Sequence, residues 1–433
     1  GIRMSRTDSQ PTPATTPDRM WQEDGNLFHH NLPGRHRAGR VWEVLFLASL
    51  LVGILALTTL IYNIVDQSFG LVAVQFKVDP ATLAVDATPV EDLSEAQLVT
   101  IIRERVSKGV VRRLDSEQPL EERSRDDLLA IVMERVVDPK IVRSWSLTDS
   151  LLKRAAIEAE RADKYPDASL EFRSWINVGF ISRPQSSSPQ LAGVRTAILG
   201  SLWTIAITIL VAFPIGVGAA IYLEEYANDN FVNRIIQTNI NNLAGVPSII
   251  YGMLGLAIFV RLLEPLTSGA LVGGVADPTT ANGRTILSAG LTLALLILPL
   301  LIVNAQEAIR AVPRSLREAG YALGATKWQT IWHHVLPNAI PGILTGTILS
   351  VSRAIGETAP LVVVGASTFI VFDPYGPFSK FTTLPIQIYQ WTARPQAEFR
   401  NLAAAAILVL LILLLTLNAT AILLRNRFSR RLA

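Results

Sequence analysis

The sequence predicts an all-α polytopic membrane protein with six transmembrane helices and one extracytoplasmic insert of helical or α+β structure. Three observations lead to this prediction. Half of the 433 residues are hydrophobic and only 17% are charged, whereas soluble domains average about 25% charged residues. The apolar residues form runs of the roughly 20 residues that a helix needs to cross a bilayer. The charged residues concentrate in one segment, because positions 67–190 hold 37 of the 75 charged side chains.

Six uncharged or nearly uncharged runs qualify as membrane helices. Each run is continuous, whereas a barrel strand alternates with a period of two. The first predicted span occupies residues 42–66, and the other five belong to a core at 191–424. The fifth run contains Arg353 and Glu357. The runs themselves are 44–65, 196–223, 235–260, 285–306, 340–372 and 401–424.

The first span has a second interpretation. Basic residues ahead of an apolar run also occur in signal peptides. The uncharged run is long, however, and no small-residue cleavage site follows it at Tyr62–Ser68. A retained membrane anchor is therefore favoured.

Basic residues predict the orientation of the spans. Arginine clusters precede the first span, lie between the fourth and fifth, and follow the sixth, so six spans place all three on one side. The positive-inside rule assigns that side to the cytoplasm. Glu224, Glu225 and Asp229 oppose this only weakly, because the rule weights basic residues. We expect both termini to be cytoplasmic, with a disordered tail at 1–41 and a short tail at 425–433.

The insert at 67–190 has the composition of a solvated domain. Its 17 basic and 20 acidic residues are balanced and show no metal-binding or catalytic spacing. Apolar residues with helical spacing predict helices around 98–106 and 128–136, whereas 71–78 and 170–181 are expected to be strands. We expect a docking or spacer domain outside the cytoplasm.

The segment at 311–337 contains the most specific motif of the chain. Its pattern resembles the EAA loop of ABC importer permeases, which has Glu-Ala-Ala, a later Gly, and then Ile and Leu-Pro at fixed offsets. Gly320 stands where that family usually has alanine. The resemblance implies a short cytoplasmic helix and turn that dock on an ATPase subunit; the alternative is an ordinary amphipathic loop. The matching residues are Glu318, Ala319, Gly320, Gly324, Ile331, Leu336 and Pro337.

Three further segments, 215–227, 242–252 and 352–360, are similar to phosphate ABC transporter permeases of the PstA type. The resemblance covers 174–424 well and the first span loosely, but it does not explain the long insert. It implies six helices of the type I ABC importer kind in the bacterial inner membrane, with inorganic phosphate as substrate. The implied partners are a homologous second permease of the PstC type, a PstB-type ATPase dimer and an external PstS-type phosphate-binding protein.

The chain lacks the residues of several catalytic classes. No Gly-x-x-x-x-Gly-Lys-Ser/Thr loop is present, so the chain has no ATPase site of that kind. The absence of cysteine excludes disulfides and thiolate metal sites. We expect a transporter subunit rather than an enzyme, with no cofactor or metal of its own and no nucleic-acid partner. The resemblance places ATP and Mg²⁺ on the partner ATPase.

Arg353 and Glu357 are the candidate substrate-pathway residues. They stand four positions apart in an apolar run, so one helix face would carry both. Charged side chains inside a membrane usually face a bundle interior or a water-filled path, and a guanidinium presents a planar fork that suits phosphate oxygens. The alternative is a purely structural ion pair.

The residues leave other function classes open. Arg353 alone does not identify the anion, so sulfate or molybdate could replace phosphate. A membrane-anchored receptor with an external ligand-binding insert is a second class, although the EAA-like loop and the six spans argue against it. A secondary carrier is a third, but no internal repeat of the kind that carriers show is evident.

Overall fold

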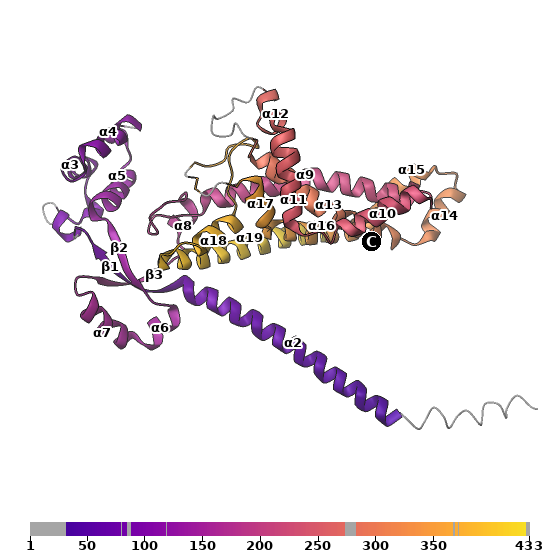
Figure 1. Cartoon of the computed structure of the whole chain (residues 1–433), viewed down its shortest axis with the longest axis horizontal. Helices are drawn as coiled ribbons and strands as arrows, with labels where there is room; N and C mark the ends of the chain where they lie inside the picture. Colours follow the sequence, from indigo (N-terminus) through magenta and orange to yellow (C-terminus); the bar gives the residue numbers. More distant parts are fainter. Residues whose placement is uncertain are drawn as a thin grey trace, which may run out of the picture. The chain divides into compact units, whose positions relative to one another are not determined.

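In the computed structural model, the described residues are 32–78, 80–84, 88–117, 119–272, 283–366, 369–370 and 372–429. The chain divides into two compact units, Gly1–Asn63 and Ile64–Ala433. Helix α2 (Leu32–Ser68) begins in the first unit and ends in the second. The second unit contains the insert and the remaining apolar helices (Figure 1).

Helix α2 is longer than the predicted first span. Its stretch Gly34–Ser68 is long and apolar enough to cross a bilayer. The prediction of a disordered tail up to residue 41 is wrong for residues 32–41, which are helical. Ala38 and the arginines around it favour helix locally, so the helix extends beyond its apolar part. The rest of the predicted tail, 1–31, lies outside the described residues.

Three strands of the insert form one antiparallel sheet in the order β2-β1-β3. They are β1 (Phe69–Phe76), β2 (Pro139–Ser144) and β3 (Ser169–Ser174). The central strand β1 pairs with both neighbours, and its Val72 and Ala73 are fully buried. The predicted strand at 170–181 is too long, because helix α8 (Val178–Ser182) follows β3. Strand β2 was not predicted, since charged residues flank its two apolar positions and leave no alternating pattern.

The insert also contains a small helical core, so it is α+β. Leu98, Ile102 and Leu128 are fully buried in one cluster of the described residues. Ser94 begins the first helix with a capping box, in which its backbone N–H donates to Gln97 Oε1 at 2.9 Å. The helices of the insert are α3 (Glu95–Arg105), α4 (Lys108–Glu117), α5 (Arg125–Val132), α6 (Leu147–Leu152) and α7 (Arg154–Lys164).

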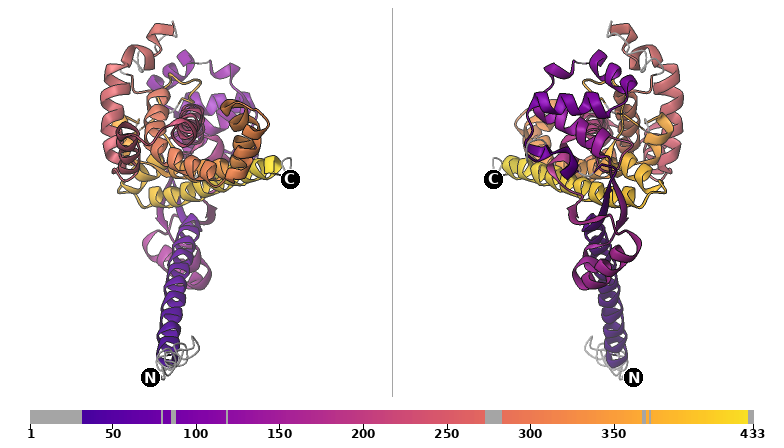
Figure 2. Two further views of the ribbon diagram at one scale, coloured as in Figure 1. Left: turned by 90° about the vertical axis from the view of Figure 1, so that its right-hand side faces the viewer. Right: turned by 90° about the vertical axis from the view of Figure 1, so that its left-hand side faces the viewer.

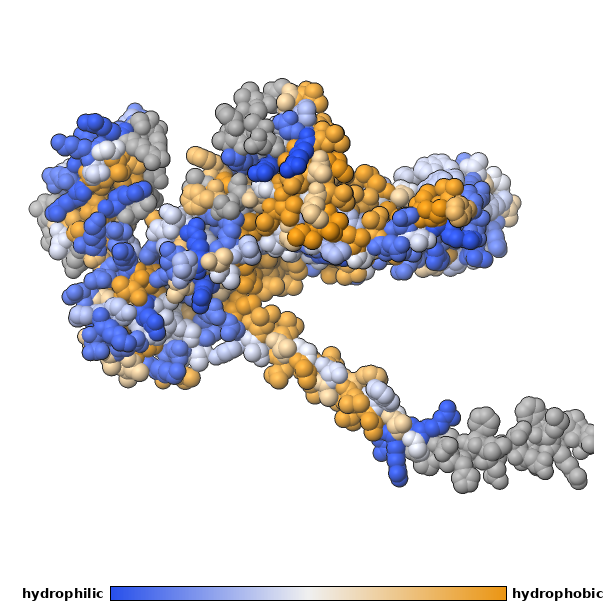
Figure 3. Space-filling view, viewed as in Figure 1, coloured by the Kyte–Doolittle hydropathy of each residue, from blue (hydrophilic) through white to orange (hydrophobic). Residues whose placement is uncertain are grey.

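Long apolar helices build the core. Helix α13 packs against α9 and α16, and its Leu293, Ile297 and Leu301 are fully buried. Helices α16 and α19 lie side by side (Figure 2). Hydrophobic residues dominate the visible face of these helices, whereas α3–α7 are largely hydrophilic (Figure 3). The long core helices are α9 (Arg195–Ile221), α13 (Ile286–Arg310), α16 (Leu336–Gly356) and α19 (Ala397–Ser429).

The predicted third span is not one helix. Helix α10 (Phe231–Leu243) and the segment that starts with α11 (Ser248–Gly255) and continues to Leu262 meet at an angle of 107°. Pro247 stands at the break in an extended conformation. Proline has no backbone N–H, so it cannot continue the helical hydrogen bonds of α10. Among the described residues, five helices could cross a bilayer, and this bent pair could add a sixth. The prediction of a helical protein with about six spans is confirmed.

The insert and the loop at 311–337 lie at opposite ends of the core bundle. The loop follows the C-terminal end of α13, where Arg310 contacts Glu224 beyond the end of α9. At the other end, Val72 and Ile141 of the sheet share a buried cluster with Phe399 at the start of α19. The sheet is thereby fixed to the core by apolar packing.

The remaining elements are short. The helices are α12 (Glu264–Thr267), α14 (Arg314–Ala322), α15 (Lys327–Thr330), α17 (Ala359–Val364) and α18 (Leu384–Thr392). The 3-10 turns are η1 (Pro80–Leu83), η2 (Val90–Asp92), η3 (Leu120–Glu122) and η7 (Ala270–Val272). The π-helical segments are η4 (Met133–Val137), η5 (Tyr222–Tyr226), η6 (Leu256–Leu262) and η8 (Ile331–Val335).

Candidate functional site

The loop at 311–337 folds as two short helices joined by a glycine turn. Helix α14 begins after Pro313 and ends just before Gly324, whose φ of 81° lies in the left-handed region. Residues other than glycine reach that region at a cost of about 1–2 kcal/mol. Helix α15 begins at Thr326, whose hydroxyl accepts from Gln329 N at 3.3 Å while Gln329 Oε1 accepts from Thr326 N at 2.9 Å.

Gly320 allows α14 to approach α15 closely. It is buried, and a Cβ at this position would lie 2.9 Å from Thr330 Oγ1 and 3.1 Å from Thr330 Cγ2. Glycine replaces the usual second alanine of the Glu-Ala-Ala pattern because Thr330 occupies the space that an alanine Cβ would need.

The predicted coupling residues divide into an inner and an outer group. Gly320 and Ile331 are buried, whereas Glu318, Ala319 and Gly324 are exposed. Leu336 and Pro337, at the start of α16, are half-buried. Leu336 and also Leu316 pack against the buried cluster that contains Ile309 and Val335. The inner group holds the loop on the bundle, and the outer group faces away from this chain.

Exposed apolar side chains gather on the same loop. Leu323 is 89% exposed, and Trp328 stacks on Trp332 with ring centroids 5.4 Å apart. Clustered exposed apolar residues are typical of protein-interaction sites. We call Tyr321, Leu323, Trp328 and Trp332 the aromatic patch.

Two ion pairs attach the loop region to the end of α9. Arg317 Nη2 lies 2.7 Å from Glu225 Oε1, and these side chains are only 16% and 6% exposed. Arg317 also donates to the carbonyls of Val312 and Ile309 at 2.7 and 3.0 Å. Arg310 forms a two-bond contact with Glu224 at 2.9 and 3.0 Å. These arginines pair with Glu224 and Glu225, two of the three acidic residues that oppose the positive-inside assignment.

Sequence reasoning missed both ion pairs. The partners are 86 and 92 residues apart. Opposite charges at such separations form no recognisable pattern, so only the proximity of α9 and α13 in the fold reveals them.

The Arg353–Glu357 pair forms, but not as predicted. Arg353 Nε lies 3.3 Å from Glu357 Oε1. The expected continuous span at 340–372 is wrong, because α16 ends at Gly356 and Glu357 is extended. Pro360 lies in the first turn of α17, where proline is well tolerated, so a new helix starts after the break at Glu357. Arg353 therefore lies at the last turn of α16, with 44% of its side chain exposed on the surface of this chain, whereas Glu357 is 16% exposed.

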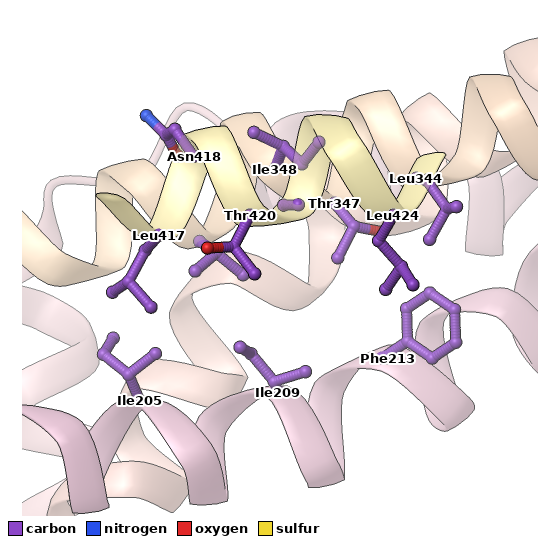
Figure 4. Close-up of a pocket in the computed structure, with 12 residues that line it drawn as sticks. Ile205, Ile209, Phe213, Leu344, Thr347, Ile348, Leu417, Asn418, Thr420 and Leu424 are labelled. Atoms are coloured by element: carbon purple, nitrogen blue, oxygen red, sulfur yellow. The ribbon is translucent and has the colours of Figure 1, made fainter. Parts of the chain in front are cut away.

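A cavity of about 390 Å³ lies among α9, α16 and α19 (Figure 4). Ile209 and Phe213 of α9 point across it toward Leu424 of α19. Asn418 points away from α9, and its Oδ1 accepts from Ser352 Oγ at 2.7 Å. An anion buried in such an apolar space would lack partners at a high cost. Arg353 on the chain surface is the better candidate for contact with an anion.

Potential metal ligands do not converge. The described residues contain no group of three or more His, Asp or Glu side chains placed to hold a metal ion. His333 is one of the two histidines of the loop, and its Nδ1 lies 3.0 Å from the carbonyl of Gln329. Its ring therefore contacts the backbone of its own helix.

Comparison with known proteins identifies relatives of the core. Phosphate transport system permease protein PstA of Mycobacterium leprae (strain TN) is 39% identical over 217 residues, which cover 50% of this chain and 65% of the relative. The PstA protein of Yersinia pestis is 34% identical over 230 residues, covering 53% and 71%. The probable ABC transporter permease protein YqgI of Bacillus subtilis (strain 168) is 35% identical over 219 residues, covering 50% and 68%. These relatives confirm the resemblance to PstA-type permeases.

Solved structures of ABC transporters are also similar. An inward-facing MetNI methionine transporter matches with a TM-score of 0.37 and 17% identity, covering 56% of this chain and 94% of that chain. A bacterial alginate importer matches with a TM-score of 0.37 and 17% identity, covering 74% and 99%.

The family match covers the core and leaves out the insert. Residues 212–433 match the family described as binding-protein-dependent transport system inner membrane component. The match starts within α9 and includes the loop at 311–337, Arg353 and α19. It spans just over half of the chain. The chain therefore belongs to the family of binding-protein-dependent transport system inner membrane components.

Proposed function

We propose that this chain is one of two permease subunits of an ATP-driven importer of inorganic phosphate. The observation that carries the proposal is the loop at 311–337, which combines a rigid attachment to the bundle with the outward-facing aromatic patch. The names of the PstA-type relatives support phosphate as the substrate. The chain would act as a transporter subunit without an ATPase site of its own.

The aromatic patch would dock on a separate ATPase dimer of the PstB type. An exposed Leu323 and two stacked tryptophans provide the large apolar contacts that typically anchor protein interfaces. Glu318, Ala319 and Gly324 are exposed beside them and could contact the same partner. ATP and Mg²⁺ would be bound by that partner.

Arg353 would contact the anion in a path between this chain and a homologous second permease. Its exposure on the surface of this chain leaves the guanidinium free to face a second subunit. The planar fork matches phosphate oxygens, and Glu357 would neutralise it between transport events. The path would thus be completed by two half-sites, one from each permease.

The two ends of the bundle suggest the orientation. If the loop binds a cytoplasmic ATPase, the insert at the opposite end faces the outside, where an external PstS-type binding protein would deliver phosphate. Both termini would be cytoplasmic, in the inner membrane of a bacterium. This agrees with the arginine clusters that flank the first and last spans.

Uptake of radiolabelled phosphate tests the proposal in cells that lack their own importer and co-express the four kinds of subunit. Leu323→Asp should abolish both uptake and co-purification of the ATPase, because it replaces the most exposed apolar side chain of the aromatic patch with a charge. Leu152→Asp is the matched control, since Leu152 is also a highly exposed leucine, at 78%, and lies on the insert. Normal uptake by Leu323→Asp would contradict the docking assignment. Equal competition by sulfate or molybdate would show that the substrate is another oxyanion.

A further inference from the structure

A polar cavity of about 240 Å³ lies where strand β3 passes into the core. Two arginines, Arg173 of β3 and Arg183 after α8, line it, and no Asp or Glu does so. The volume lies below the roughly 300–1,000 Å³ of sites for drug-sized ligands, so the cavity suits a small ion. Trp175 and Phe180 form a buried apolar wall beside the two guanidinium groups.

The two arginines lack a close counter-charge. In the part of the chain that the structure describes, neither forms an ion pair shorter than 4.0 Å. Arg173 Nη2 donates to the carbonyl of Gln190 at 3.3 Å, and its Cζ lies 5.0 Å from the centre of the Trp175 ring. Glu171, on the same strand, is the acidic residue whose charge reaches Arg173, and it accepts instead from Ser169 Oγ at 3.3 Å. The cavity therefore has a net positive charge.

Burial makes this arrangement costly when the cavity holds only water. Burial lowers the pKa of Arg173, the charge of Glu171 raises it, and the charge of Arg183 lowers it again. Arginine nevertheless stays protonated in proteins, so the half-buried Arg173 lies beside a second positive charge on the exposed Arg183. An anion between them would relieve both the desolvation and the repulsion.

The surrounding backbone is preorganised. The carbonyl of Arg183 accepts from Arg195 N at 3.1 Å, and Val194 N donates to the carbonyl of Phe180 at 2.8 Å. Gly193 lies so close to the Arg183 carbonyl that a side chain there would collide with it. A Cβ at Gly179 would lie 3.2 Å from Asn177 Oδ1 and 3.4 Å from Arg183 Cζ, so a branched side chain there would press on both groups. The backbone that carries Arg183 is thus fixed, and the Arg173 guanidinium is held by the carbonyl of Gln190.

We propose that this cavity is a binding site for a phosphate group at the insert end of the bundle. Arg173 and Arg183 would donate charge-assisted hydrogen bonds to its oxygens, as planar guanidinium groups do. The group could come from free inorganic phosphate or from a lipid headgroup. Its use as a holding site before the membrane path rests on the proposed function, whereas binding itself does not.

Equilibrium binding of radiolabelled inorganic phosphate tests the site on the purified full-length chain in a phosphate-free maltoside detergent. The Arg353→Gln, Glu357→Gln double variant serves as the background, so that contact with Arg353 does not contribute. In this background, Arg183→Gln should weaken binding at least about tenfold, and Gly179→Val should do so without removing a charge. Arg154→Gln is the matched control, because Arg154 pairs with Glu158 on an exposed face of the insert.

The outcomes distinguish free phosphate from a lipid headgroup, and they distinguish the proposed transport function from the proposed binding site. Loss of phosphate binding on addition of phosphatidylglycerol, with retention in phosphatidylcholine, would identify a headgroup as the natural occupant. Equal phosphate affinity for the background protein and its Arg183→Gln and Gly179→Val derivatives would overturn the site. If wild-type cells take up no phosphate but Arg183-dependent binding persists, only the proposed transport function fails. If uptake is normal and binding ignores Arg183, only this inference fails.

Discussion

Replacing Arg317 should detach the loop at 311–337 from the bundle. Arg317→Met removes both bonds to Glu225 and both bonds to the carbonyls at the end of α13. Glu225, whose side chain is 6% exposed, would keep its charge with no cation beside it. Breaking a buried pair in this way typically costs about 3–5 kcal/mol. We expect a loss of that size in the free energy of opening of the loop.

The neighbouring pair provides a matched control. Arg310 also donates two hydrogen bonds to its partner, one to each carboxylate oxygen of Glu224, but the Arg310 side chain is 67% exposed. Solvent screens such pairs, and they contribute about 0–1 kcal/mol. Arg310→Met should therefore change the opening free energy by less than about 1 kcal/mol. The two arginines differ in burial and in the two backbone carbonyls that only Arg317 contacts, so the contrast compares an enclosed arginine with an exposed one.

Hydrogen–deuterium exchange of the purified chain measures the opening. Arg317→Met should speed exchange in residues 314–335, whereas Arg310→Met should leave it close to wild type. The double change Arg317→Met, Glu225→Met removes the stranded charge and should recover much of the protection. Equal exchange in the two single variants would refute the reasoning, because burial would then not decide the strength of the pair.

Four other variants test separate parts of the structure. Gly320→Ala should destabilise the loop by pressing on Thr330, and Thr330→Ala in the same chain should restore its exchange protection; no rescue would mean that another contact is disturbed. Gly324→Val should reduce uptake while the protein still inserts, since φ of 81° costs a side chain about 1–2 kcal/mol; unchanged uptake and ATPase stimulation would contradict the coupling role. Replacing residues 77–167 with an Asn-Gly turn should still allow the core helices to insert into the membrane, because Val74 pairs with Ser169 and the two cut ends are therefore close. Failure to insert would show that the insert is needed for folding. The double change Arg353→Gln, Glu357→Gln should assemble but not transport phosphate, and full uptake would leave the pair a structural role only.

The helical class and most spans were predictable because length and hydropathy alone mark a membrane helix. The breaks were not, because proline has no single meaning in such helices. Pro214 and Pro299 lie inside α9 and α13 without ending them, whereas Pro247 and Pro360 stand at the start of the helix that follows a break. In the first case, neighbouring packing compensates for the lost hydrogen bond. Only the tertiary fold distinguishes the two cases.

The candidate site was predictable where it is local in sequence. The motif from Glu318 to Pro337 indicated a helix and a turn, and the positive φ of Gly324 and the cap at Thr326 provide them. The motif does not specify which side chains face the bundle: Leu316 packs inward, whereas Tyr321 and Leu323 face outward. The contacts that join distant segments gave no signal. Glu225 with Arg317, and Arg173 with Arg183 around a cavity, become evident only from the fold.

The fold also connects the loop to Arg353 through a single element. Helix α16 begins with Leu336 at the end of the loop and reaches Arg353 in its last turn, a distance of about 26 Å at 1.5 Å per residue. Helix α16 packs along α13 and α19. It can therefore move only as a rigid body, either together with these helices or by sliding along them. The buried Arg317–Glu225 pair ties the same loop to the end of α9. A displacement imposed on the aromatic patch would therefore reach α9 and α16 together, and α16 would move Arg353 relative to a second permease. This arrangement couples the proposed docking surface to the proposed substrate contact without any long flexible segment between them.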